Sequence, residues 1–580
     1  MARLIWSILF LTTLGSLAFI LLTDWKPKGH SIESLPITGG VYHAGLASEL
    51  STLDPALATD SPSGWCMIQL FDGLVRFQAN VEDSVGPAIA SSWDISPDHK
   101  QYTFHLRDDV CFHDWIVTDE LGTRLPTKCK GRAVTSEDFR YSFERVLDPK
   151  TGSPRSLIFE VLEGAKEFMK GKASHVRGLL TPDPRTLTIR LVQPFKPFLK
   201  TLTMASALVV PREDIEQLGP RFSTAPCGTG AFRFGGYRGK RGQPGRELSL
   251  LANERYFCKR PHLNQVVFHI EANEEKRFQM FLSGRLHHSV IPDPDYDRLG
   301  DSEALGIIKT PEVSRLGVYY YGMNVQRPPF DSADIRRALS HAVDREAIKK
   351  YIKSDRVDVA VGPLPPALRH KHPFSADRTG STLSPTAFNL TRAGELLDRA
   401  GYRIDPTIGL RTGFPVLPLD VPNGEEHVRI AKAIQANLAD LGIESLIRTR
   451  SLPVHLEHLR RGDSLIFRLG WVADYKDADS FLYYNFHSRN IGTSNYSRYA
   501  NPMVDRLLDE ARQAADQHRR DDLYQQIEET LVEDAVWINL FYLKTAIVRQ
   551  PIVQELNLSE FGEHTIAFRE VWLNIPRSAP

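Results

Sequence analysis

Cysteine is scarce in this chain, with five residues among 580. So few cysteines exclude a small scaffold held together by disulfides. Neither charge is in excess, since 71 Lys and Arg balance 71 Asp and Glu. Without a basic excess, nucleic acid is not an expected partner. The composition, 42% hydrophobic and 24% charged, is typical of a folded globular chain and excludes wholesale disorder.

Catalytic and nucleotide-binding motifs are also missing. The sequence has no Gly-x-Ser-x-Gly nucleophile elbow and no His-Glu-x-x-His zinc helix. Gly228-Thr229-Gly230 lacks the third glycine of a dinucleotide loop, and Gly239-Lys240-Arg241 lacks the flanking residues of a phosphate loop. The pairs His287-His288 and His455 with His458 have no third ligand at a useful spacing. We therefore expect a protein that is not an enzyme and that has no cofactor and no metal site.

Long hydrophobic runs are confined to the N-terminal end. Residues 4–22 carry no charge and would span about 28 Å as a helix, close to the thickness of a hydrocarbon core. No small-x-small cleavage site follows, and no cysteine near residue 20 offers a lipid attachment. We expect residues 1–30 to be a signal peptide or signal anchor with a tether, and favour an anchor retained in the cytoplasmic membrane. The rest of the chain would then be extracytoplasmic, in a periplasm.

Export makes disulfides possible. Cys111 and Cys129 flank a short polar loop, whereas Cys227 and Cys258 flank a predicted hairpin. We expect these two pairings, with Cys66 left over. Buried free thiols are the alternative.

Short strands and amphipathic helices alternate along the remaining chain. Alternating apolar residues predict strands at Tyr102 to Leu106 and Thr186 to Leu191. The segment Thr135 to Asp138 is typical of a helix start, and Ile430 to Leu441 carries a helical apolar stripe. This mixture predicts a large α/β protein with more than one core.

Several short segments in a fixed order carry a resemblance to a known family. They are Leu53-Asp54-Pro55, Leu70 to Leu74, Pro87 to Trp93, Phe112-His113-Asp114, Thr135 to Phe139, Tyr141 to Arg145, Gly228-Thr229-Gly230, Arg336 to Arg345, Gly470 to Tyr475 and Asn501 to Asp505. Together they resemble the extracytoplasmic solute-binding proteins of dipeptide and oligopeptide ABC importers, solute-binding protein family 5, over about nine-tenths of the chain. The chain departs from the family pattern in an insertion between Asp114 and Thr135, with Cys129 near its end.

The resemblance implies an α/β fold with two lobes, the clamshell of periplasmic binding proteins, preceded by one N-terminal hydrophobic helix. Lobe I would comprise residues 31–270 and 541–580, with an extra subdomain at about 76–180. Lobe II would comprise residues 271–540. The chain would cross between the lobes near Ile270-Glu271 and near Leu540, and a ligand in the cleft would close the lobes by hinge bending.

The same resemblance suggests a ligand site at the motif Trp471-Val472-Ala473-Asp474. In the similar proteins the aspartate of this motif meets the α-amine of the ligand. A buried ammonium needs an opposite charge, because its desolvation otherwise prevents binding. Trp471 and Tyr475 would supply flat apolar walls. A loop or helix-cap role for Asp474 and a core position for Trp471 are the alternatives.

Four further residues are candidates for ligand contact. Trp65 lies in a segment that borders the cleft in relatives, and Tyr321 and Asn324 belong to a strand predicted to lead into the cleft. Arg468, beside the motif, is a candidate partner for the ligand carboxylate. The tyrosines of that strand have a core position as their alternative.

These features predict the substrate-binding component of an ABC importer. A monomer would capture short peptides without chemistry and deliver them to a separate membrane permease. The alternatives are the same fold with a nickel chelate, an oligosaccharide or an opine-like amine as ligand, and a membrane-anchored sensor.

Overall fold

The computed structural model describes residues 36–78, 84–114, 116–118, 124–126, 128–292, 306–353, 356–369 and 386–575. The expected signal or anchor segment, residues 1–30, lies outside these ranges. Within them, no helix combines the length and the apolar character that a membrane crossing requires.

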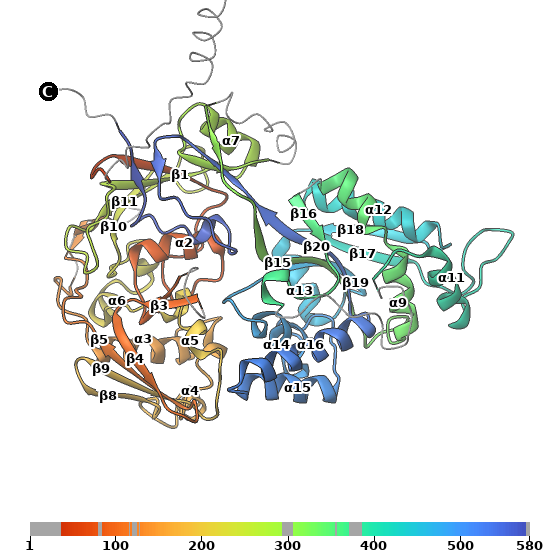
Figure 1. The fold of residues 1–580 in the computed structure, drawn as a ribbon, viewed down its shortest axis with the longest axis horizontal. Helices are drawn as coiled ribbons and strands as arrows, with labels where there is room; N and C mark the ends of the chain where they lie inside the picture. Colours follow the sequence, from red (N-terminus) through yellow and green to blue (C-terminus); the bar gives the residue numbers. More distant parts are fainter. Residues whose placement is uncertain are drawn as a thin grey trace, which may run out of the picture.

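The first lobe is built on a four-stranded sheet with the order β1-β12-β11-β10 (Figure 1). Strand β1 (Val41–Leu46) pairs in parallel with β12 (Gln265–Ile270). Strands β11 (Glu247–Ala252) and β10 (Phe232–Arg238) follow in antiparallel order. Alternate residues of β1 are buried, as expected for a sheet with one covered face.

A second sheet of this lobe has the order β4-β5-β9-β8 and lies in the expected extra subdomain. Its strands are β4 (Ala90–Ile95), β5 (Gln101–Leu106), β9 (Thr186–Arg190) and β8 (Leu179–Asp183). Helix α3 (Ser136–Leu147) packs beside it and begins where predicted, with the backbone N–H of Thr135 donating to Asp138 Oδ2. The sheet shares one continuous hydrophobic core with the rest of the lobe.

The second lobe is built on a six-stranded sheet with two cores, one on each face. The strand order is β16 (Val357–Val359), β20 (Trp537–Thr545), β15 (Val313–Met323), β19 (Ile466–Val472), β17 (Leu417–Pro422) and β18 (Ser445–Arg450). One core contains residues of α9 (Ala333–Ala342), α11 (Leu390–Arg399) and α12 (Glu425–Ala439). The other contains residues of α13 (Leu452–Arg461), α14 (Asp479–Phe486), α15 (Pro502–Gln513) and α16 (Gln517–Glu533).

The remaining helices and strands are mostly short. They are α2 (Ser61–Leu70), α4 (Ala165–Met169), α5 (Phe198–Thr201), α6 (Arg212–Leu218), α7 (Glu274–Leu282), α10 (Arg345–Ile348), β2 (Val75–Phe77), β3 (Val85–Pro87), β6 (Ile116–Thr118), β7 (Arg124–Pro126), β13 (His288–Val290), β14 (Ile308–Lys309), β21 (Ile547–Arg549), β22 (Val553–Gln554) and β23 (Trp572–Leu573).

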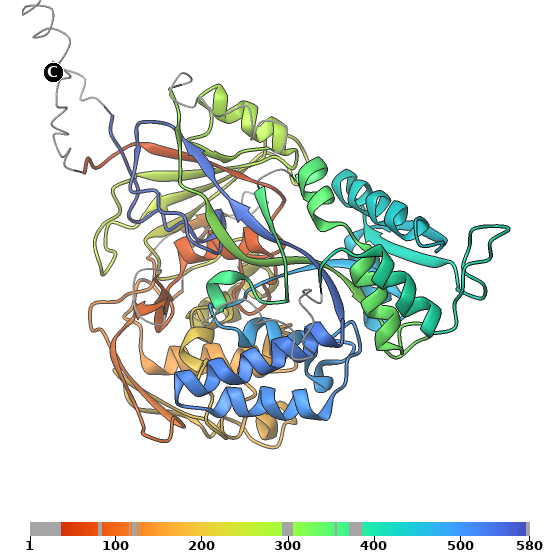
Figure 2. The same ribbon diagram turned by 45° about the vertical axis from the view of Figure 1, so that its right-hand side comes forward.

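Two antiparallel strands, β15 and β20, run between the lobes (Figure 2). The first crossing therefore lies at β15 rather than near Ile270-Glu271. The residues after β12 form α7 and β13, which stay beside β1, and the N–H of His287 donates to the carbonyl of His43 at 2.9 Å. After β20 the chain returns to the first lobe, whose core includes Ile547 and Phe568.

The two cysteine pairs predicted from the sequence are not formed. All five cysteines are free thiols in this structure. Cys111 lies in a bridge opposite Ala133, and Cys258 is exposed beside the Arg76 guanidinium, 3.2 Å away. Cys129 instead lies next to Cys227, with 3.5 Å between the sulfurs. The pairing by nearness in the sequence is therefore wrong, because the folded lobe brings two loop segments 98 residues apart together here.

Candidate ligand-binding site

A cavity of about 380 Å³ lies between the lobes. The first lobe lines it with Thr59, Pro154, Arg155, Leu157, Ile158 and Met204. The second lobe lines it with Trp471, Val472, Asp474, Tyr484, Thr493, Ser494 and Tyr496. Its volume and its mixture of aromatic, aliphatic and a few polar side chains are typical of small-molecule pockets.

One carboxylate and one guanidinium meet in this cavity. Asp474 follows β19 in the second lobe, and Arg155 Nη1 donates to Asp474 Oδ2 from the first lobe at 3.2 Å. Their side chains are 22% and 27% exposed, so the pair is only partly removed from water. Asp474 Oδ1 makes no hydrogen bond to any described residue. That oxygen is therefore available to a ligand.

Ser480, in α14, holds both motif residues in place. The indole N–H of Trp471 donates to the Ser480 carbonyl at 2.7 Å. The Ser480 hydroxyl accepts from the backbone N–H of Asp474 at 2.9 Å. The flat wall and the carboxylate of the cavity thus share one support on a helix.

Comparison with known proteins identifies the family. The family described as bacterial extracellular solute-binding proteins, family 5 (middle region), matches residues 84–493. The chain belongs to this family. This family 5 protein is 27% identical to the dipeptide-binding protein DppE of Bacillus subtilis, over 88% of this chain and 90% of the relative. It is also 27% identical to heme-binding protein A of Haemophilus influenzae, over 85% of each chain.

A solved structure shows the same architecture. The periplasmic binding protein DppA from Helicobacter pylori, in complex with the peptide STSA, superposes with a TM-score of 0.74 at 25% identity, covering 93% of this chain and 99% of that one. The two-lobed fold predicted from the sequence is thereby confirmed. The chain is a solute-binding protein and not an enzyme, and the members of its family are extracytoplasmic.

Two predicted contact residues of this family 5 protein lie in the core instead of the cavity. Tyr475 is buried, and its hydroxyl donates to Asp479 Oδ2 at 2.5 Å. Burial raises the pKa of this phenol well above its ordinary value. Trp65 is fully buried, stacks on Phe568 and donates its indole N–H to the carbonyl of Ile566 at 3.0 Å. Both side chains support lobes rather than line a cavity.

The other three predicted residues also lie away from the cavity. Tyr321 is buried in one core of the second lobe. Asn324 donates its side-chain N–H to the carbonyl of Gly462 at 3.1 Å and is 1% exposed. The Arg468 guanidinium lies over the Tyr319 ring, 4.1 Å from its centroid. None of these three residues lines the cavity.

A second, larger cavity of about 690 Å³ adjoins the first, and the two share Leu157 and Tyr484 as lining residues. Several charged side chains line it, namely Lys100, Glu160, Glu163, Lys166, Glu167, Arg177, Arg489 and Arg512. Arg489 donates to the Tyr483 hydroxyl at 3.1 Å and pairs with no carboxylate in the part of the chain that the structure describes. A ligand carboxylate would therefore find an unpaired cation here.

Residues 474–477, which we name the closure loop, carry three ion pairs to the first lobe or to the C-terminal segment. Asp474 pairs with Arg155, Lys476 Nζ lies 2.8 Å from Glu560 Oε1, and Lys200 Nζ lies 3.1 Å from Asp477 Oδ2. Burial would raise the pKa of Asp477, but Arg520 and Lys200 hold it well below its ordinary value. These ion pairs therefore hold the closure loop against the first lobe and the C-terminal segment.

Sequence reasoning missed Arg155, Leu157 and Tyr484. Arg155 is 319 residues from its partner Asp474, and it follows a Gly-Ser-Pro turn that could equally be any surface loop. Tyr484 follows the motif by ten residues, and an aromatic residue in a helix is more often part of a core. No local sequence pattern distinguishes these three residues from ordinary surface or core residues.

Proposed function

We propose that this family 5 protein captures short peptides with a free N-terminus in the cavity between its lobes and delivers them to the permease of an ABC importer. The observation that carries the proposal is the carboxylate of Asp474, which lines the cavity and has one oxygen without a partner among the described residues. A peptide ammonium needs such a partner when it leaves water. The dipeptide-binding relative supports the same ligand class.

In this proposal binding is an exchange of charge partners. The ligand ammonium donates to Asp474 Oδ1, and Arg155 moves its hydrogen bond from Asp474 to a carbonyl or carboxylate oxygen of the ligand. Trp471, Tyr484 and Leu157 contact side chains without polar selection. For longer peptides, Arg489 in the adjoining cavity replaces Arg468 as our candidate partner for the ligand carboxylate.

The remaining parts of the proposal concern the setting of the protein. Residues 4–22 keep it in the cytoplasmic membrane beside the permease, and it works there as a monomer. Peptide capture then needs only hinge motion and no bond-making step.

Isothermal titration tests the proposal with trialanine and N-acetyl-trialanine as probes. Asp474→Asn should weaken trialanine binding more than tenfold, because loss of one partner of a buried charge pair costs about 3–5 kcal/mol and partial exposure here lowers that figure. The wild type should bind the acetylated peptide as weakly as the variant binds either peptide. Asp463→Asn is the matched control, since Asp463 is exposed and lines neither cavity. Equal affinity of wild type and Asp474→Asn for trialanine would refute the role of Asp474.

The apolar walls favour one second candidate, a large hydrophobic solute. Trp471, Tyr484, Leu157 and Met204 would suit such a ligand, and one relative is a heme-binding protein. Affinity for heme would not depend on an ammonium partner. A protein that binds heme equally with Asp474 or Asn at this position, and binds no peptide, would establish this candidate instead.

A further inference from the structure

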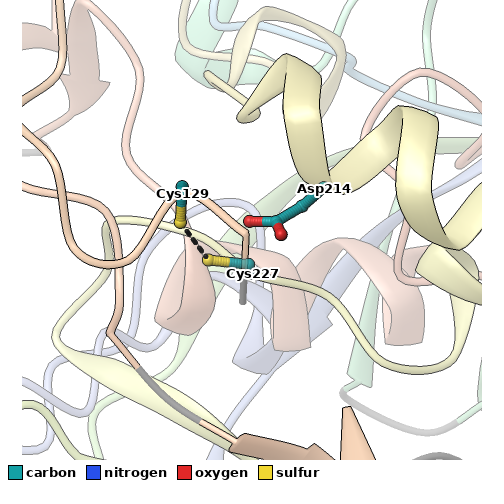
Figure 3. Close-up of side chains that lie close together, drawn as sticks. All are labelled: Cys129, Asp214 and Cys227. Atoms are coloured by element: carbon teal, nitrogen blue, oxygen red, sulfur yellow. Dashed lines mark hydrogen bonds between the residues drawn. The ribbon is translucent and has the colours of Figure 1, made fainter. Parts of the chain in front are cut away.

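Two cysteines meet inside the first lobe, away from both cavities. The sulfurs of Cys129 and Cys227 are 3.5 Å apart, and the residues are 3% and 1% exposed (Figure 3). Both sulfurs lie near one backbone oxygen, that of His113, at 3.6 and 3.4 Å. The two side chains therefore point to the same place from segments 98 residues apart.

The segment that carries Cys227 is held tightly. A Cβ added to Gly228 would lie 2.1 Å from the Leu70 carbonyl oxygen, so only glycine permits this contact with α2. The N–H of His113 donates to the Gly228 carbonyl at 2.8 Å, and its imidazole lies 3.0 Å from the Gly230 carbonyl oxygen. The approach of the two cysteines thus results from a packed framework.

We propose that Cys129 and Cys227 form a disulfide bond when the protein is exported. The reaction is thiol–disulfide exchange with a disulfide donor of the oxidising compartment, an oxidised protein dithiol. One cysteine thiolate attacks a donor sulfur and forms a mixed disulfide, which releases one donor thiolate. The second cysteine then attacks this mixed disulfide, the Cys129–Cys227 bond forms, and the second donor thiolate leaves. The two cysteines lose two protons and two electrons, and the donor disulfide is reduced to a dithiol.

Burial, with Asp214 beside the pair, determines when this bond can form. The Asp214 carboxylate is 1% exposed, and one of its oxygens lies within 4.8 Å of both sulfurs (Figure 3). Burial, the neighbouring Cys129 and Asp214 together raise the pKa of the Cys227 thiol. Because both cysteines are buried, a donor disulfide does not reach them once the lobe has folded around the pair. The bond therefore forms during folding, and burial then protects it from reductants, as a structural bond and not a switch.

The same three side chains are also donors that zinc accepts. A zinc site would need the Cys227 thiolate, which burial and Asp214 oppose by raising the pKa of that thiol, and a fourth ligand that the cluster of three does not supply. The geometry therefore favours the disulfide, and a bound metal becomes an outcome of the test.

Alkylation of the exported full chain tests the proposal. The protein is purified from a periplasm without reductant, denatured and treated with iodoacetamide, and its intact mass is measured. Three of the five cysteines should be alkylated, and peptide mapping should find residues 129 and 227 linked. Cys129→Ala should show four alkylated cysteines, and the exposed-site control Cys258→Ser should show two with the same link.

Five alkylated cysteines, or a link between other cysteines, would overturn the proposal. Five alkylated cysteines together with one equivalent of zinc in the native protein would reassign the cluster to a metal site. A second measurement does not require a variant that folds well. Wild type that has been unfolded and refolded in reductant should have a Tm about 5 °C or more below that of the untreated protein, since the bond closes a loop of about 100 residues. Peptide affinity should stay unchanged, and an unchanged Tm would contradict the proposal.

Discussion

The contact between Lys200 and Asp477 tests whether the closure loop sets the balance between open and closed lobes. Lys200 lies on α5 of the first lobe, and the two side chains are 16% and 3% exposed. Asp477 also accepts from Arg520 Nη2 at 2.8 Å within the second lobe. Lys200→Met therefore removes the pair between lobes without leaving Asp477 unpaired.

The size of the effect follows from this geometry. At 3.1 Å and an effective dielectric constant of about 20, the Coulomb attraction is about 5 kcal/mol. Desolvation of the lysine offsets most of it, and hydrogen bonds to charged groups contribute about 1.5–3 kcal/mol net. Because Lys200 is partly exposed, we take the net contribution of the pair to lobe closure as about 1–2 kcal/mol. The ratio of closed to open protein should fall about 5- to 30-fold.

Small-angle X-ray scattering and titration calorimetry measure this shift. Ligand-free Lys200→Met should have a larger radius of gyration than wild type, whereas the peptide-saturated forms should agree. Its peptide affinity should weaken by up to the same factor, because the closed state is the one that holds ligand. Lys196→Met is the matched control, since Lys196 lies in the same segment and has no ion pair among the described residues. Equal scattering and affinity for the two variants would refute the reasoning.

Two further predictions concern the stability of the first lobe. Asp54→Ala should lower the free energy of unfolding in urea by about 3 kcal/mol, the lower end of the cost of breaking a buried pair, because the Arg145 side chain is 14% exposed and loses the partner that it now bonds at 2.7 and 2.5 Å. Asp148→Ala, at the end of the same helix, should cost much less, and equal losses would contradict this. Burial lowers the pKa of His288 from 6.5 to about 3, so the neutral ring is favoured in the folded state and stability should fall as the pH drops below 6.5. In His288→Gln the urea midpoint should change less between pH 7 and pH 5 than in wild type. An equal change in both proteins would exclude His288 as the source of the pH dependence.

The sequence could predict those residues of the site that lie next to each other in the chain. Trp471 and Asp474 lie in one short motif, and the structure brings both to the cavity wall. Arg155 and Lys200 could not be predicted, because they meet the closure loop from the other lobe, 319 and 277 residues away in the chain. Only the packing of the lobes brings these charges together.

The tyrosines of β15 show a second limit. Alternation identifies a strand, and on a sheet with one open face it also identifies the buried side. Strand β15 is central in a sheet with a core on each face, so Tyr319 and Tyr321 join one core and Tyr320 the other. No alternation in such a strand shows which side chain faces a ligand.

The two-lobed fold was predictable because the family motifs extend along most of the chain, but the first crossing was not, because α7 and β13 remain with the first lobe.

Strands β15 and β20 join the lobes as one hydrogen-bonded ribbon. The register of this ribbon shifts between Ser314 and Val318 and again between Tyr319 and Tyr320. Paired strands resist stretching and sliding, whereas an interrupted ladder bends more readily. The ribbon therefore bends most readily near these shifts, and rotation of one lobe relative to the other is favoured there. A permease that receives this protein would therefore meet two lobe surfaces whose relative rotation is set at this ribbon.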